Sequence, residues 1–209
     1  MKWMILDFET MGTDSLECAA VDISAMVIDT ARFLSQPYTL RDVTLARRFK
    51  LSVKDQVENY GFTVEEDTVK FWMAQSPEVR AKIKPKADDL TVVQFVEQFH
   101  DYLIESPKID HWFTRGNSFD PVILYRLFKA VGKTAHLNEY LKFWRCRDLR
   151  THIDAKLDFP KINGFVPVAN EEFFNKVFQQ HDSSWDILAD VLRLQAIVRA
   201  ENDLEMIEK

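Results

Sequence analysis

One stretch near the N-terminus, WMILDFET (residues 3–10), decides how the fold is interpreted. Its first half, Trp3–Leu6, is short and continuously apolar, which is typical of a buried strand. Residues two apart on a strand project to the same face, so Asp7 and Glu9 direct two carboxylates into one space. Two such groups repel unless a cation lies between them, and hard oxygen ligands suit Mg²⁺ or Mn²⁺. Many strands simply end in acidic turn residues, so the pair alone is weak evidence for a metal site.

The rest of the sequence predicts further strands and then strands alternating with helices. Ala20–Asp29 is apolar at alternate positions and predicts a second strand, and Arg47–Leu51 predicts a weaker third. After Thr91 the apolar residues recur every three or four positions, which indicates an amphipathic helix. Ile109–Thr114 predicts another strand, and the last strong helical pattern follows Ser183. This order indicates an α/β domain with a mixed sheet.

Two more places combine polar residues with the start of a predicted helix. Asp120 precedes Pro121 and suits an N-cap followed by proline at the first helical position. In HDSSWD (residues 181–186), Ser183 with Asp186 three positions later resembles a helix start. An aspartate cap needs no further role, and a lone histidine such as His181 beside a helix start is usually structural. Each site taken alone therefore favours a structural interpretation.

Composition limits the class of protein. The chain has 209 residues, of which 46% are hydrophobic, enough for one substantial core, so a single domain over residues 1–209 is expected. The net charge of −6 argues against a protein that simply coats nucleic acid, because such domains are usually basic. It does not exclude an enzyme that binds only a few nucleotides.

Arg145, Arg147 and Arg150 form a local basic patch that would suit phosphates, although a solvated face is the more common role of such a patch.

The cysteines and the hydropathy pattern bear on the compartment. Cys18 and Cys146 have no metal-ligand spacing, which fits a reducing cytoplasm. The apolar run at the start is too short for a signal peptide, and no stretch has the length of a membrane span. We therefore expect a cytoplasmic protein with no membrane partner.

Taken together, the acidic sites and the histidine change this interpretation. Their order, Asp-x-Glu-Thr early, Asp after a mid-chain strand and His-x4-Asp near the end, resembles that of the DEDDh 3′–5′ exonucleases, the DnaQ-like superfamily. Within it, the chain is similar to the exodeoxyribonuclease A type of T-even phages. The resemblance covers nearly the whole chain and is carried by DFETMG (Asp7–Gly12), FWxxQSPE (Phe71–Glu78), RGxSFDxxIL (Arg115–Leu124), FWxxRDxRT (Phe143–Thr151), GFV (Gly164–Val166) and HDS (His181–Ser183).

The resemblance implies a fold and a set of catalytic roles. The fold would be RNase H-like, a mixed β-sheet flanked by α-helices. Asp7, Glu9 and Asp186 would hold one divalent cation, Mg²⁺ or Mn²⁺; Asp7 would bridge to a second, and Asp120 would act partly through water. Two such ions, roughly 3.5–4 Å apart, stabilise the attacking and leaving oxygens of a phosphodiester. His181 would be the general base, since its ordinary pKa near 6.5 keeps it neutral around pH 7–8.

The same resemblance implies contacts to the terminal nucleotide. Residues after the first strand would lie against it, and rings near the site would stack on bases, a sequence-tolerant mode of binding. Most rings must nevertheless be core, because 12% of the chain is aromatic. The expected substrate-binding residues are Phe8, Thr10, Met11, Trp72, Asn117 and Phe119.

Three other acids near these motifs are expected to have structural roles. Asp148 is expected to cap a helix or form a salt bridge. Asp182 and Asp190 lie near the site in sequence, and we expect neither to bind metal directly.

The expected activity is removal of nucleotides, as 5′-monophosphates, from the 3′ end of single-stranded DNA. An exoribonuclease of the same family, like ribonuclease T or oligoribonuclease, is the alternative, because DNA and RNA differ by a 2′-hydroxyl that the motifs do not address. A non-catalytic nucleic-acid-binding module is a distant third, since all four metal-site acids and the histidine are present. A phage-encoded protein would act in the host cytoplasm.

Overall fold

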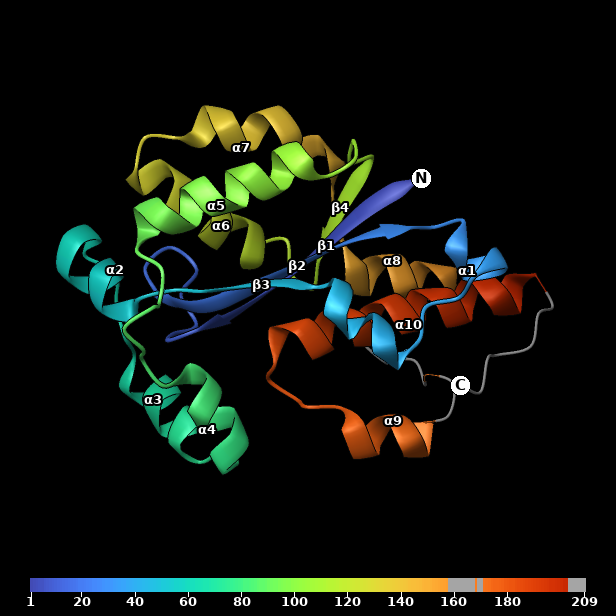
Figure 1. Ribbon diagram of the computed structural model, residues 1–209, viewed down its shortest axis with the longest axis horizontal. Coiled ribbons are helices and arrows are strands. Elements are labelled where there is room, and N and C mark those ends of the chain that lie inside the picture. Colours follow the sequence, from blue (N-terminus) through green and yellow to red (C-terminus); the bar gives the residue numbers. More distant parts are fainter. Residues whose placement is uncertain (158–167, 169–170, 203–209) are drawn as a thin grey trace.

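A computed structural model describes residues 1–157, 168 and 171–202. The GFV stretch at 164–166 lies outside these residues. Figure 1 shows one central sheet with helices on both faces. No helix in the described part of the chain is long and apolar enough to cross a bilayer.

The sheet has five strands in the order β3-β2-β1-β4-β5. β1 pairs antiparallel with β2, which pairs antiparallel with β3, whereas β1, β4 and β5 run parallel. The expected mixed sheet is confirmed, although the three-residue β5 is too short to show a pattern in the sequence. The strands are Lys2–Thr10 (β1), Ala20–Asp29 (β2), Arg47–Lys50 (β3), His111–Thr114 (β4) and Cys146–Asp148 (β5).

The three parallel strands end at the same edge of the sheet. β1 continues past the expected Leu6 to Thr10, so Asp7 and Glu9 lie within the strand, opposite Ser24 and Asp22 of β2. In open α/β sheets, ligands bind outside the carboxyl ends of parallel strands. The fold therefore places the acidic pair where a ligand site is expected.

Alternation along β1 divides the core into two layers. Met4, Leu6 and Phe8 pack into one cluster with the helices on the first face, and Trp3 and Ile5 pack into another with the helices on the second face. The first face carries α5 (Val92–Glu105), α6 (Asp120–Ala130) and α7 (Thr134–Tyr140), and the second carries α1 (Arg32–Ser35), α8 (Leu149–Lys156) and α10 (Ser183–Glu201).

The remaining helices lie around this core. α3 and α4 project beside one end of the sheet (Figure 1) and bury Trp72 and Val79 against Val21 of β2. We call residues 66–83 the arm. The other elements are α2 (Val53–Tyr60), α3 (Glu66–Met73), α4 (Pro77–Ile83), α9 (Glu171–Val177) and two 3₁₀ turns, Leu40–Leu45 and Phe143–Arg145.

Helix starts follow the sequence with two corrections. Thr91 caps α5 as expected, with Oγ1 accepting the backbone N–H of Gln94. α10 begins one residue earlier than the expected start, because Asp182 rather than Ser183 is its N-cap. Asp120 is not the N-cap of α6 but its first residue, since Phe119 occupies the N-cap position.

Candidate active site

Three carboxylates converge between β1 and α10. Asp7 and Glu9 lie on the side of β1 that carries Trp3 and Ile5, which is the side covered by α10. Asp186 lies in the first turn of α10. Oxygen atoms of Asp7, Glu9 and Asp186 all lie within 4.8 Å of one another. The same-face pair predicted from the sequence thus gains a third acid from a helix 177 residues later than Glu9.

Asp120 approaches the same centre from the opposite layer. It begins α6, its carboxylate is buried, and the backbone of Phe8, which lies between Asp7 and Glu9 on β1, opposes the rise of its pKa that burial causes. Its negative charge contributes to raising the pKa of Asp7. The fold therefore brings all four predicted acids together.

Burial and mutual repulsion make this cluster costly without a counterion. Burial, followed by the neighbouring carboxylates, raises the pKa of Asp7 and Glu9 well above their ordinary values. Burial is also the main cause that raises the pKa of Asp120 and Asp186 to about 7. An all-oxygen set of this charge fits Mg²⁺ or Mn²⁺, because hard cations prefer carboxylate ligands and relieve the repulsion.

Two neighbouring acids, Asp190 and Asp148, have structural partners. Asp190, one turn after Asp186, receives Nε of Arg115 on both carboxylate oxygens at 2.9 Å, and Nη1 of Arg193 at 2.9 Å. Asp148 caps α8 by accepting the backbone N–H of Thr151, one of the two roles expected for it. Asp190 and Asp148 therefore have the structural roles expected for acids outside the cluster.

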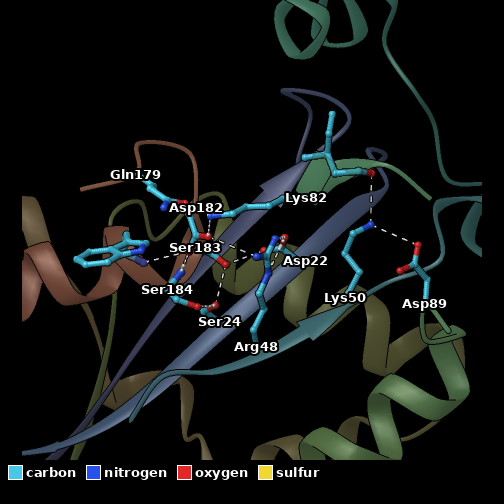
Figure 2. Close-up of polar contacts among 12 residues, drawn as sticks. Asp22, Ser24, Arg48, Lys50, Lys82, Asp89, Gln179, Asp182, Ser183 and Ser184 are labelled. Carbon is cyan, nitrogen blue, oxygen red and sulfur yellow. Dashed lines mark hydrogen bonds and ion pairs between the residues drawn. The ribbon is translucent and has the colours of Figure 1, made fainter. Parts of the chain in front are cut away.

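Asp182 directly follows His181 in the chain, and Figure 2 shows its contacts. Its Oδ1 accepts the backbone N–H groups of Ser184 at 3.1 Å and Trp185 at 3.2 Å and so caps α10. Its Oδ2 is paired with Lys82 of the arm and, at 3.4 Å, with Arg48 of β3. Asp182 therefore joins α10, the arm and the sheet.

A second polar layer on β2 continues this network (Figure 2). Fully buried Asp22 pairs with Arg48 and accepts the hydroxyl of Ser183 at 2.6 Å. Ser24 is hydrogen-bonded to the hydroxyls of Ser183 at 2.7 Å and Ser184 at 2.8 Å. The sequence analysis missed these residues. Their signal was present, since Asp22 and Ser24 are polar residues at alternate positions of an otherwise apolar strand.

His181 lies against the arm rather than within the acid cluster. Its ring packs edge-on against Phe71, with centroids 5.0 Å apart, and Trp72, 5.9 Å apart. Its φ is 61°, the only positive value among the described non-glycine residues, and such backbone costs about 1–2 kcal/mol. Burial lowers the pKa of His181, so the imidazole is neutral at pH 7. Strained backbone of this kind persists only where surrounding contacts enforce it.

A cavity of about 590 Å³ opens beside the acids. Glu9, Thr10 and Phe119 line one side, and Phe71 and Trp72 of the arm line the other. Of the six residues expected to contact the terminal nucleotide, Thr10, Trp72 and Phe119 border this cavity.

The other three residues do not border it. Phe8 is buried in the core, so its side chain does not line the cavity, and its backbone opposes the rise of the Asp120 pKa that burial causes. Met11 packs against two core clusters. With its amide oriented to suit its neighbours, Asn117 donates to the backbone oxygen of Arg147 and accepts the backbone N–H of Asp148, both at 3.2 Å. Tertiary packing, which local sequence does not reveal, decides these orientations.

The accessible ring of the arm is Phe71, not the expected Trp72. Trp72 is only 2% exposed, and its indole N–H donates to the carbonyl oxygen of Thr10 at 2.9 Å. Its neighbour Phe71 is 42% exposed and presents the accessible ring. Both belong to the same motif, and the sequence did not indicate which one faces the cavity.

Comparison with known proteins identifies relatives of the whole described region. Residues 2–184 match the family described as the 3′–5′ exoribonuclease Rv2179c-like domain. The chain is also 30% identical to the exodeoxyribonuclease of Enterobacteria phage T4 over 226 residues, an alignment covering 96% of this chain and 91% of the relative.

Solved structures share the fold. Exonuclease I (apo) superposes with a TM-score of 0.56 at 16% identity, covering 95% of this chain and 42% of that one. Exonuclease I from Methylocaldum szegediense gives 0.57 at 12% identity, covering 97% and 41%. E. coli exonuclease I in complex with a 5cy-dA13 oligonucleotide gives 0.56 at 16% identity, covering 95% and 40%. The chain spans less than half the length of these structures.

Proposed function

From the premise that the chain belongs to the 3′–5′ exoribonuclease Rv2179c-like family of DnaQ-like 3′–5′ exonucleases, we propose that it degrades single-stranded DNA from the 3′ end. The fold is the RNase H-like α/β fold that the resemblance implied. The observation that carries the proposal is the convergence of Asp7, Glu9 and Asp186 within 4.8 Å beside a cavity large enough for a nucleotide.

The acids are the proposed ligands of two divalent cations. Asp7, Glu9 and Asp186 would hold one, and Asp7 and Asp120 would take part in holding the second. When bound, the cations supply charge that stabilises the attacking and leaving oxygens of the phosphodiester. Bound cations also remove the repulsion that raises the pKa values of these carboxylates.

His181 is the proposed general base. Its lowered pKa keeps the imidazole neutral at pH 7, so it can accept a proton from the attacking water. Phe71 and Trp72 hold the ring, and Asp182 holds the loop through Lys82 and Arg48. These contacts would orient the base so that water attack releases a 5′-monophosphate and leaves a new 3′-hydroxyl.

The cavity is the proposed place of the 3′-terminal nucleotide. Phe71 and Phe119 border it and could stack on a base, and Thr10 lines its floor. Such contacts accept any base, because every base has an aromatic face. A substrate end entering this cavity must be unpaired, since duplex opening costs a few kcal/mol for each base removed from the stack.

DNA is favoured over RNA by the relatives. The phage T4 relative is named an exodeoxyribonuclease, and E. coli exonuclease I, which shares the fold, is seen with dA13 and dA16 oligonucleotides. The family description names an exoribonuclease, which supports RNA as the second candidate. The two differ in how the site accommodates a 2′-hydroxyl.

The test is digestion of 5′-labelled DNA and RNA of equal sequence in Mg²⁺ or Mn²⁺. DNA should shorten as a ladder that releases mononucleotides, and blunt duplex or a 3′-phosphate should slow it. Asp7→Ala should abolish hydrolysis and serves as the control. Faster digestion of RNA than of DNA would favour the exoribonuclease, the second candidate, over the deoxyribonuclease. Internal cutting of a circle at a comparable rate would contradict the exonuclease assignment.

A further inference from the structure

An exposed aromatic surface precedes the edge strand β5. Phe143 is 74% exposed and Trp144 is 59% exposed, with their ring centroids 5.0 Å apart. The ammonium group of Lys142 lies 5.9 Å from the Trp144 ring. Two large adjacent rings this accessible require a partner, because soluble proteins seldom leave aromatic residues exposed together.

Two arginines continue this surface toward the acids. Nη1 of Arg147 donates to the backbone oxygens of Trp144 and Cys146 at 2.8 Å, which holds its guanidinium against the backbone that carries Trp144. The charge of Arg150 lowers the pKa of Asp120, so this guanidinium lies within electrostatic reach of the acid centre. Across residues 1–157, 168 and 171–202, no carboxylate forms a salt bridge with Arg147 or Arg150. Arg145, by contrast, donates to the Ile109 carbonyl.

A second cavity lies beside the aromatic surface. It measures about 370 Å³, and its lining runs from Asn117, three residues before Asp120, past Tyr125 of α6 to Phe143. Asn117 is itself attached to β5 through the backbone of Arg147 and Asp148. The lining therefore includes the loop that precedes Asp120.

Strand order sets the direction of the path. The first cavity is lined by the end of β1, the arm and Phe119, and the arm packs on Val21 of β2. The acids lie at the end of β1, and Asp120 follows β4. Arg147 and Arg150 lie in and just after β5, one strand further. Neighbouring strands are about 4.8 Å apart, so the arginines lie on the side of the acids away from the first cavity.

We propose that Phe143, Trp144, Arg147 and Arg150 form a binding site for the single strand on the 5′ side of the scissile phosphate. The inference rests on the proposed function, which assigns the 3′-terminal nucleotide to the first cavity. The rings would stack on successive bases and the arginines would contact phosphates, the combination that binds single strands without sequence preference. In a chain of net charge −6, two arginines that have no carboxylate partner among the described residues and lie beside exposed rings favour a polyanion over a second copy of the chain.

The test separates length-dependent binding from chemistry. Hydrolysis is measured for a dinucleotide, which ends before this surface, and for an oligonucleotide of about 12 nucleotides. Phe143→Ala/Trp144→Ala should raise KM for the longer substrate about tenfold or more, since each stacked base contributes at least that order, with its kcat and the dinucleotide kcat/KM within about twofold. Ile104→Ala and Lys108→Ala, exposed positions on α5 and before β4, are the controls.

Binding without turnover gives the second readout. Fluorescence anisotropy of the labelled oligonucleotide, measured in chelator so that no hydrolysis occurs, should show that Phe143→Ala/Trp144→Ala binds it more weakly than wild type. For Arg147→Ala/Arg150→Ala, the slope of log K against log salt should fall by roughly 1.4, because each single-strand phosphate that an arginine no longer neutralises removes about 0.7 from the slope.

The outcomes distinguish this site from the proposed function. Unchanged KM, affinity and salt slope in both variants would overturn the binding site while leaving the exonuclease intact. A wild-type dimer that becomes a monomer in Phe143→Ala/Trp144→Ala, with unchanged oligonucleotide binding, would make the surface a subunit interface instead. Failure of wild type to hydrolyse even the dinucleotide would refute the proposed function.

Discussion

At the scale of single residues, the burial and mutual repulsion of the four acids should lower the stability of the metal-free protein. A carboxyl group with a raised pKa binds its proton more tightly in the folded protein than in the unfolded chain. For Asp120, whose pKa is raised to about 7, the free energy of unfolding should therefore fall as pH rises from about 4 to above 7. Below pH 4 both states are protonated and the free energy of unfolding no longer changes with pH through this group.

The matching variant is Asp120→Asn in metal-free protein. At pH 8 it should melt several degrees above wild type, because a neutral amide replaces a buried charge, and the difference should shrink toward pH 4. Thermal unfolding in chelator across this range checks it, with exposed Asp101→Asn as the control. A melting temperature below that of wild type at pH 8 would mean that Asp120 is stabilised by its hydrogen bond more than it is destabilised by its neighbours.

His181 permits a paired substitution. His181→Ala and His181→Gly should both lose about 10²–10⁴-fold in kcat, the usual contribution of a positioned base, while oligonucleotide affinity is retained. His181→Gly should be the more stable by about 1–2 kcal/mol, because glycine adopts positive φ without strain. Kinetics and denaturant unfolding measure both effects. Normal turnover with weakened binding would instead make His181 a binding residue.

At the scale of elements, the arm links the nucleotide cavity to the catalytic loop. Phe71 and Trp72 border the cavity and contact His181, and Lys82 on the same arm pairs with Asp182. The arm thus contacts both the cavity and the loop that carries His181, the proposed base. A small displacement of the arm should misplace the base more than it weakens the nucleotide contacts.

Lys82→Met tests this link. It should lower kcat about tenfold, since misplacement by about 1 Å is costly in catalysis, with KM within about twofold. Lys82→Arg should recover most of the rate, whereas exposed Lys84→Met, just after α4, should match wild type. Steady-state kinetics supply the measurement. Equal losses in Lys82→Met and Lys82→Arg, or a change confined to KM, would contradict a positioning role.

At the scale of the whole molecule, metal binding and folding should be coupled. The acids come from β1, α6 and α10 and meet only in the folded chain, so Mg²⁺ or Mn²⁺ should bind the unfolded chain weakly and raise the melting temperature by mass action. The increase should be larger at pH 8 than at pH 6, because protons compete with the metal for carboxylates whose pKa values are raised. Metal titrations at both pH values, with Asp7→Ala as control, test it. An unchanged melting temperature in active protein would refute the coupling.

The sequence by itself determined the elements and residue types with strong local signals. Alternation predicted β2 to the residue, Thr91 marked the start of α5, and the spacing of Asp7 and Glu9 predicted one shared face. These features depend on contacts between residues close in the chain, so local sequence specifies them. The motif resemblance added the family, which the comparisons confirm.

Only the tertiary structure decided which side chains face the site. Phe8 and Trp72 are buried where the sequence analysis expected substrate contacts, whereas Phe71 is exposed. Asp22 contacts Ser183 and Arg48 contacts Asp182, and these two contacts hold the His181 loop. In each pair the two residues are more than 130 positions apart in the chain. The physical reason is that orientation depends on which surfaces pack together, and β1, the arm and α10 become neighbours only when the sheet assembles.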